Sequence, residues 1–307
     1  MKFALLIGSN YLNTPGSRLY GCINDIINIK NMLIDAYDYN SSNMIVMRDD
    51  KLNMLPTREN IIANLTYVIN ESANYDELWI HYSGHGSRIV DNDDDENDYY
   101  DEVIVPCDFK TQGFITDDVI FNIIKNSKCR TIIMMDCCNS ASVCDLQWCF
   151  EKNNNTFAKT VIPKREIILN PNIFMISGCK DDEYSNDIYD TDNNESCGAF
   201  TSTFIRCLRN SRHNIDIFTL YDNICNELIK SGFKYQLPIL SSSSEYPEYT
   251  FQKEMIIKTV TVTENVDTTT SPTKFDQIHK VLGNNMVSIM INKAHRDPNK
   301  YKPKKKR

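Results

Sequence analysis

Short apolar runs alternate along this chain with longer stretches in which apolar residues recur every three or four positions. The first pattern is typical of buried strands, and the second of helices that cover a sheet. Strands are expected near residues 2–8, 44–48, 77–82, 103–105, 131–135, 173–176 and 236–241, and helices near 22–37, 57–72, 117–126, 199–209 and 218–231. This alternation predicts an α/β fold: a mostly parallel sheet of six strands or slightly more, with helices on both faces.

The alternation stops near residue 254, which divides the chain into two parts. Residues 1–254 are predicted to form the folded domain, with 151–171, rich in Asn, Lys and Pro, as a loop between its halves 1–150 and 172–254. A Thr- and Ser-rich linker and a basic end then indicate a C-terminal extension, residues 255–307, outside that domain.

Charge is distributed unevenly over the 307 residues. The net charge is −8; the segment 91–102 carries eight carboxylates and no basic residue, whereas 291–307 carries eight Lys and Arg against one Asp. A globally acidic protein is a poor general nucleic-acid binder, so only the basic end is a candidate for contact with an anionic surface. Nuclear import and simple solubilisation are the other interpretations of that end.

The sequence gives no sign of export or of a membrane partner. The apolar run 3–7 is too short for a signal-peptide core or a membrane-spanning helix. The eleven cysteines are odd in number, and the adjacent Cys137 and Cys138 suit a disulfide framework poorly. We therefore expect a reducing compartment and a cytoplasmic location, with a nuclear one left open by the basic end.

Two polar motifs follow predicted strands at what should be one edge of the sheet. His85, in the sequence Ser-Gly-His-Gly, follows the strand 77–82, and Cys137 and Cys138 follow the strand 131–135. Ligands of open parallel sheets bind beyond the carboxyl ends of the strands. A histidine and a cysteine there suit nucleophilic thiol catalysis, because the imidazole takes the thiol proton. A structural histidine and a core thiol are the alternatives.

These motifs belong to a longer ordered set that resembles the type I metacaspases, which are caspase-like cysteine endopeptidases. The matching segments are 19–25 (LYGCIND), 82–86 (YSGHG), 106–108 (PCD), 113–118 (GFITDD), 136–140 (DCCNS), 176–182 (ISGCKDD), 198–201 (GAFT) and 236–243 (QLPILSSS). They extend over about residues 1–246. The resemblance implies a caspase–hemoglobinase fold, in which 1–150 is the p20-like part and 172–254 the p10-like part.

The resemblance also implies the catalytic roles. His85 would be the general base and Cys138 the nucleophile, and the N–H groups of Gly86 and Cys138 would form the oxyanion hole. The chain departs from the family pattern after the nucleophile, with Asn139 for the usual His and Ala141 for Gly. A catalytically weak or inactive caspase-like scaffold is therefore the alternative to an active enzyme.

Three further residues match positions that line the S1 pocket of the family, namely Asp25, Ser83 and Asp136. Two carboxylates in a desolvated pocket favour a Lys or Arg side chain in the substrate. The resemblance thus implies protein or peptide substrates with a basic P1 residue. As alternatives, Asp136 is only a turn residue and Asp25 only a carboxylate at a helix start.

Metacaspases of this type are typically activated by calcium, so Ca²⁺ is the expected cofactor. The matching positions are Asp101, Asp117, Asp118 and Asp145. Hard oxygen ligands from several loops suit Ca²⁺. The acidic run 91–102 has carboxylates at EF-hand spacing, but Glu96 replaces the turn glycine, and a solvated acidic loop is expected instead.

Self-cleavage and assembly follow from the same resemblance. Metacaspases often cut themselves between the two halves of the domain, where the basic candidates are Lys152, Lys159, Lys164 and Arg165. An ordinary basic surface loop is the alternative. Because metacaspases are usually monomers, a monomer is expected.

Overall fold

The computed structural model describes most of the first 253 residues of the chain. The described ranges are 1–50, 54–90, 100–137, 144, 146–153, 156–161, 166–178, 187–190, 195–233 and 236–253. By its internal contacts the chain divides into the units Met1–Glu254 and Met255–Arg307, and every described residue belongs to the first unit.

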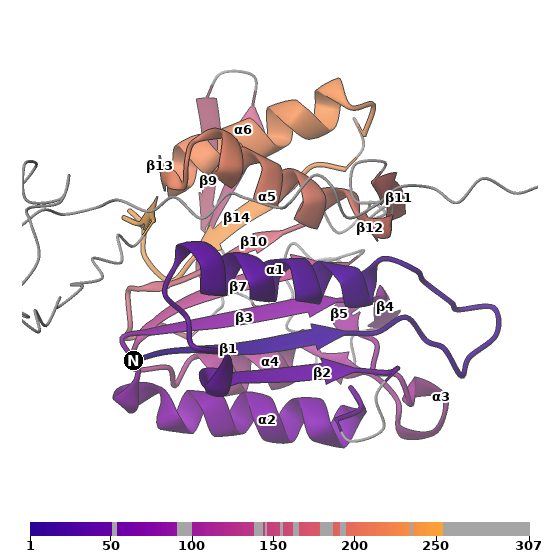
Figure 1. The fold of residues 1–307 in the computed structure, drawn as a ribbon. Coiled ribbons are helices and arrows are strands. Elements are labelled where there is room, and N and C mark those ends of the chain that lie inside the picture. Colours follow the sequence, from indigo (N-terminus) through magenta and orange to yellow (C-terminus); the bar gives the residue numbers. More distant parts are fainter. Residues whose placement is uncertain are drawn as a thin grey trace, which may run out of the picture. The chain divides into compact units, whose positions relative to one another are not determined.

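A mixed sheet of eight strands forms the centre of this unit (Figure 1). Its order is β2 (Met44–Arg48), β1 (Lys2–Gly8), β3 (Glu77–Ser83), β7 (Arg130–Asp136), β10 (Ile173–Ser177), β14 (Ile239–Ser242), β8 (Trp148–Asn153) and β9 (Thr156–Val161). The first five strands are parallel, and β14, β8 and β9 each run antiparallel to the preceding neighbour. The predicted, mostly parallel sheet is confirmed, and with eight strands it is slightly larger than the six expected at least.

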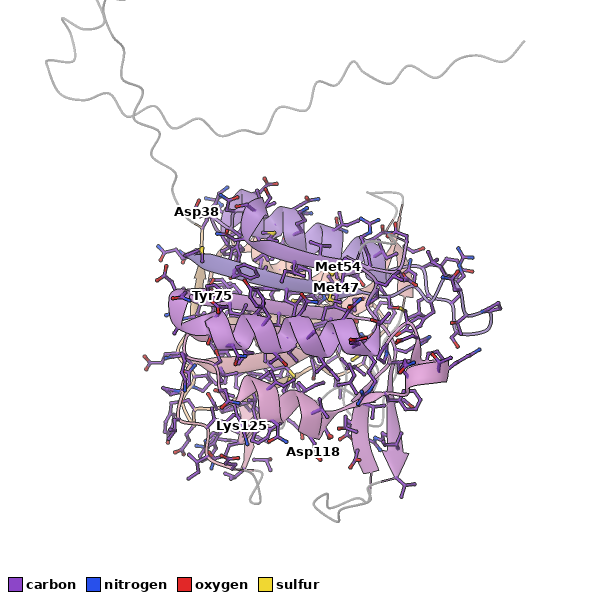
Figure 2. The ribbon with its side chains drawn as sticks, turned by 90° about the horizontal axis from the view of Figure 1, so that it is seen from below. Asp38, Met47, Met54, Tyr75, Asp118 and Lys125 are labelled. Atoms are coloured by element: carbon purple, nitrogen blue, oxygen red, sulfur yellow. The ribbon has the colours of Figure 1, made fainter. Side chains whose placement is uncertain are left out.

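Helices cover both faces of the sheet, as the alternating pattern predicted (Figure 1). One face packs against α1 (Cys22–Ala36), α5 (Ala199–Asn210) and α6 (Ile217–Lys230), and the other against α2 (Arg58–Asn70) and α4 (Asp117–Ile124). Successive residues of a strand point to opposite faces, so Leu6 joins the first apolar cluster and Leu5 the second. Figure 2 looks onto the second face and labels Met47 and Tyr75, two members of its cluster.

Shorter elements complete the described part of the chain. They are the 3-10 turns η1 (Ser41–Asn43) and η2 (Glu71–Asn74), the helix α3 (Phe109–Gln112), the three-stranded sheet of β4 (Gly86–Val90), β5 (Tyr100–Ile104) and β6 (Ile115–Thr116), and the pairs β11 (Asp187–Asp190) with β12 (Glu195–Gly198) and β13 (Asn214–Asp216) with β15 (Thr250–Gln252). No helix among the described residues is long and apolar enough to cross a membrane.

The segment 151–171, predicted as a loop, is in part a β-hairpin. The end of β8 and the whole of β9 lie in it, and β9 forms one border of the eight-stranded sheet. Most side chains of β9 are exposed, so its sequence lacks the apolar alternation of a half-buried strand. Phe157 faces inward, and its ring lies 5.5 Å from that of Phe218 in α6.

Candidate active site

The two motif-bearing strands end side by side. β3 and β7 are parallel neighbours, with Ser83 opposite Asp136 at their carboxyl ends, and the Gly84 N–H donates to the Asp136 carbonyl at 3.3 Å. The segments that carry His85 and Cys137 therefore leave the sheet at one place, as predicted. Cys138 lies outside the described residues, together with Asn139 and Ala141.

The surroundings of Cys137 are those of a core thiol. Its side chain is completely buried in the apolar cluster under α2 and α4. This burial is consistent with the prediction that Cys138, and not Cys137, is the nucleophile.

The imidazole of His85 is oriented by a main-chain carbonyl. Its Nε2 lies 2.8 Å from the carbonyl oxygen of Ser17, and a carbonyl can only accept. In the neutral ring Nε2 therefore carries the proton, and Nδ1 holds the lone pair that a general base needs. Gly86 follows as the first residue of β4 and pairs with Ile104 of β5. The oxyanion role of its N–H stays a prediction.

The carboxylates predicted for the S1 pocket are both nearly inaccessible to solvent. Asp25 is 1% exposed and Asp136 is 4% exposed. The Asp25 Oδ2 accepts a hydrogen bond from the Ser83 hydroxyl at 2.7 Å, and its Oδ1 accepts from the Gly198 N–H at 2.8 Å. The Asp136 Oδ2 accepts from both the N–H and the hydroxyl of Thr201, at 3.0 and 2.7 Å.

Gly198 shows how closely the two carboxylates approach one another. A Cβ added there would lie 2.2 Å from the Asp136 Oδ2 and 2.9 Å from the Asp25 Oδ2. No side chain other than hydrogen fits between them. We call this group of Asp25, Ser83, Asp136, Gly198 and Thr201 the acidic cluster. The donors described here are neutral amide and hydroxyl groups, which orient both carboxylates.

The sequence interpretation missed several members of the site. Gly198 and Thr201 lie in a segment that matched the family, but the sequence gives them no chemical signature. Ser17 acts through its carbonyl, which any residue would supply, so no sequence signal could have found it. These contacts join parts of the chain more than 60 residues apart.

The carboxylates predicted to bind Ca²⁺ are arranged differently. Asp101 lies in β5, and Asp117 and Asp118 begin α4, where Figure 2 shows Asp118 at the end opposite Lys125. The Asp117 Oδ2 accepts the Glu102 N–H at 3.2 Å, and its Oδ1 accepts the Asp118 N–H at 2.8 Å. Glu102 in turn forms an ion pair with Arg88, at 3.3 Å.

These residues do not by themselves fit a calcium ion. In the part of the chain that the structure describes, no three His, Cys, Asp or Glu side chains are grouped so as to hold a metal. The fourth predicted ligand, Asp145, and most of the acidic run 91–102 lie outside that part. The calcium site remains a prediction that depends on them.

Two of the four basic residues named as self-cleavage candidates are held in the hairpin. Lys152 in β8 forms an ion pair with Asp222, and Lys159 in β9 forms one with Glu245 while lying over the rings of Trp148 and Tyr246. A cavity of about 500 Å³ beside Lys159 contains none of the catalytic candidates. Cleavage at either lysine would require the hairpin to open. Lys164 and Arg165 lie outside the described residues.

Comparisons with a family model and with known sequences all indicate the same family. A family model described as metacaspase, peptidase C14 domain, matches residues 2–147. Metacaspase-1 of Cryptococcus neoformans is 42% identical over 154 residues, 48% of this chain and 34% of that protein. Metacaspase-1A of Neurospora crassa is 43% identical over 152 residues, 48% of this chain and 33% of that protein. The chain thus spans about a third of the length of these two relatives.

A longer match and two solved structures complete the comparison. Metacaspase-1 of Meyerozyma guilliermondii is 31% identical over 290 residues, 79% of this chain and 69% of that protein. A protein from Geobacter sulfurreducens superposes with a TM-score of 0.56 at 19% identity, over 82% of this chain and 97% of that one. Caspase-1 from Spodoptera frugiperda gives 0.52 at 13% identity, over 83% and 91%. At these identities the likeness shows the fold alone, and it confirms the caspase-like α/β architecture.

Proposed function

This chain belongs to the metacaspase family of cysteine-type peptidases, and from that premise we propose that it is a cysteine endopeptidase cleaving after Arg or Lys. The observation that carries the specificity is the convergence of Asp25 and Asp136 on Gly198. Two buried carboxylates side by side attract a cationic side chain and repel an anionic one. In the proposed complex, the P1 ammonium or guanidinium group is bound by these carboxylates.

The proposed reaction uses His85 and Cys138. The Nδ1 of His85 takes the thiol proton, and the thiolate attacks the scissile carbonyl carbon. The tetrahedral intermediate collapses as the C–N bond breaks, and the imidazolium gives its proton to the leaving amine. A thioester remains, and water, deprotonated by His85, hydrolyses it to the carboxylate product and the free thiol. The Ser17 carbonyl supports this proposal because it holds the ring in the tautomer that leaves Nδ1 basic.

A panel of fluorogenic peptide amides that differ only at P1 tests the proposal. We expect turnover with Arg and Lys at P1, and at least about 100-fold less with Gln or Asp, because neither Gln nor Asp carries the positive charge that the two carboxylates would bind. Cys138→Ala should abolish turnover, whereas Cys137→Ala, a change in the apolar cluster, should retain most of it. Full activity of Cys138→Ala, or a preference for Asp at P1, would refute the proposal.

Calcium dependence is a separate part of the proposal, supported by the four matching carboxylates. Isothermal titration of the full chain with CaCl₂ should give a binding heat that Asp118→Asn with Asp145→Asn removes. Peptide turnover should rise with Ca²⁺ in the wild type and not in this variant. Equal turnover in EDTA and in millimolar Ca²⁺, with no binding heat, would remove calcium from the function.

A non-catalytic scaffold is the second candidate, and Asn139 and Ala141 are the observations that favour it. A Cβ at position 141, three residues after the proposed nucleophile, restricts the backbone more than the glycine of the family pattern does. If this candidate is correct, the wild type shows no turnover under any condition, and Asn139→His with Ala141→Gly restores it. Turnover by the unaltered chain excludes the scaffold.

A further inference from the structure

Tyr11 adopts a backbone conformation that a bulky residue rarely accepts. Its φ is +54°, in the left-handed region, and its side chain is 1% exposed. Such strain persists only where the surroundings enforce it, and it is frequent at functional sites. The segment after β1 therefore holds Tyr11 in place at some energetic cost.

The carboxylate of Asp49 provides the restraint. Its Oδ1 accepts the N–H of Asn10 and its Oδ2 accepts the N–H of Leu12, both at 2.9 Å. One buried side chain thus fixes the residues immediately before and after Tyr11. Charged acceptors make the stronger kind of hydrogen bond to backbone N–H groups, so this clamp can stabilise an unfavourable φ between them.

The ring of Tyr11 lies against the imidazole of His85. Their centroids are 4.6 Å apart, at an interplanar angle of 34°. On another side, the ring meets the edge of Phe109 at 6.3 Å. With the Ser17 carbonyl on Nε2, the imidazole is therefore held both along its edge and over its face by one segment, residues 11–17.

The hydroxyl of Tyr11 holds the backbone of the same histidine. It accepts the His85 N–H at 2.8 Å and donates to the Val105 carbonyl at 2.7 Å. The neighbouring Tyr82 hydroxyl donates to the His85 carbonyl at 2.7 Å and accepts the Val105 N–H at 3.2 Å. The two hydroxyl oxygens lie 3.2 Å apart, and together they engage both backbone polar groups of His85.

Both hydroxyls keep their protons throughout the working pH range. Burial raises the pKa of Tyr11 and of Tyr82 well above the usual range of a phenol. The two hydroxyls also explain why a glycine, Gly84, precedes His85. A Cβ at Gly84 would lie 2.6 Å from the Tyr82 hydroxyl oxygen and 2.9 Å from that of Tyr11.

We propose that Tyr11, clamped by Asp49, is a positioning residue that sets the orientation of His85 for proton transfer. In the contacts described above its side chain meets His85, Tyr82, Val105 and Phe109, and none of these belongs to the acidic cluster. It acts on the ring through the tilted contact of the two rings and on the backbone through its hydroxyl. The inference rests on the proposed function of His85 and adds to it the element that fixes the geometry of the base.

The test is Tyr11→Phe in the full chain, which keeps the ring and removes the hydroxyl. We expect kcat on an arginine amide to fall at least about tenfold, because a small misplacement of a catalytic group has a large effect on rate. KM should change less than about threefold, because P1 binding is left intact. Asp49→Asn, which cannot accept both N–H groups, should reproduce the same split between kcat and KM.

A second readout separates positioning from stability. The rate at which iodoacetamide alkylates Cys138, located by mass spectrometry, reports the thiolate at each pH. A well-placed imidazole lowers the pH midpoint, and in Tyr11→Phe we expect it to rise toward about 8.5, the value of an ordinary thiol. Tyr37→Phe is the matched control. It removes a hydroxyl bonded to another histidine, His213, at 3.0 Å and should alter thermal stability only.

The outcomes distinguish the inference from the function on which it rests. If the wild type turns over substrate and Tyr11→Phe and Asp49→Asn keep its kcat and its alkylation midpoint, the positioning role is wrong and the dyad stands. If Tyr11→Phe and Tyr37→Phe lose activity only in proportion to lost folded protein, the role of Tyr11 is structural, and the inference is also wrong. A wild type without turnover and without a reactive Cys138 refutes both.

Discussion

The protein contains two groups of neighbouring carboxylates, which differ in how closely the carboxylates approach one another and in what they pair with. In the acidic cluster, Asp25 and Asp136 approach one another across Gly198. In the second group, which comprises Asp101, Glu102, Asp117 and Asp118, the oxygens of Asp117 accept backbone N–H groups, and Glu102 pairs with Arg88.

The difference shows that carboxylate content alone does not define a binding site. At the acidic cluster the nearby main chain is that of Gly198, which has no side chain to separate the carboxylates. At the second group the start of α4 offers N–H groups that lack partners within the helix, and Asp117 satisfies one of them. In both groups carboxylates accept backbone N–H groups, but Asp25 and Asp136 are also brought together beside Gly198, whereas Glu102 is paired with Arg88.

The largest effect is expected from Asp136→Asn. The amide oxygen can still accept from Thr201, so the structure should persist, but the charge is lost. We expect kcat/KM for an Arg P1 amide to fall about 100-fold, since removing one partner of a buried charge pair costs a few kcal/mol. A Gln P1 amide should be affected much less. An equal loss on both amides would contradict the assignment of the cluster to P1 binding.

Gly198→Ala should be the next most severe change. The new Cβ would lie 2.2 Å from the Asp136 Oδ2, so that carboxylate must move. Overpacking of this kind costs about 2 kcal/mol, which corresponds to about 30-fold in kcat/KM for the Arg amide. Gly178→Ala, whose Cβ would lie 3.3 Å from the Asp136 Oδ1, is the control and should retain most activity. Similar losses in the two variants would show that the spacing at Gly198 is not decisive.

His81, in the strand β3 that also carries Ser83 of the acidic cluster, makes the stability of the fold depend on pH. This side chain is completely buried, neither ring nitrogen has a hydrogen-bond partner among the described residues, and burial lowers its pKa to about 3. Between about pH 6.5 and 3 only the unfolded chain binds this proton, so stability is full above pH 6.5 and falls as pH falls. The loss at pH 5 should be about 2 kcal/mol.

His81→Leu should remove that part of the acid sensitivity. Denaturant unfolding at pH 7 and at pH 5 measures it as the difference between the two free energies of unfolding. If this difference is the same in the variant as in the wild type, the acid sensitivity arises from groups other than His81, such as the acidic cluster.

The smallest effect is expected in the second group. Asp117→Asn replaces one accepting oxygen by an NH₂ group, which cannot accept the Glu102 or Asp118 N–H. In EDTA the free energy of unfolding should fall by about 1 kcal/mol. Asp35→Asn, on an exposed position of α1, should change it by less than about 0.5 kcal/mol. A stabilised Asp117→Asn would indicate repelling carboxylates that need a cation, and would make the two groups alike.

The sequence by itself determined the strands of the sheet centre and the position of the two motifs. β1, β7 and β10 are buried on both faces over most of their length, and near-continuous apolar runs such as those at 3–7 and 131–135 are typical of that environment. The hairpin of β8 and β9 was not predictable in the same way, because an exposed border strand places few constraints on its residues.

Only the tertiary structure decided which groups surround His85 and the carboxylates. Ser17 contributes its main-chain carbonyl, Gly198 contributes the lack of a side chain, and Tyr11 contributes a left-handed backbone conformation. No recognisable local pattern in the sequence encodes any of these properties. They depend on distances between segments that are far apart in the chain. Apolar periodicity reports burial one element at a time, whereas the arrangement of a site arises only when several elements pack together.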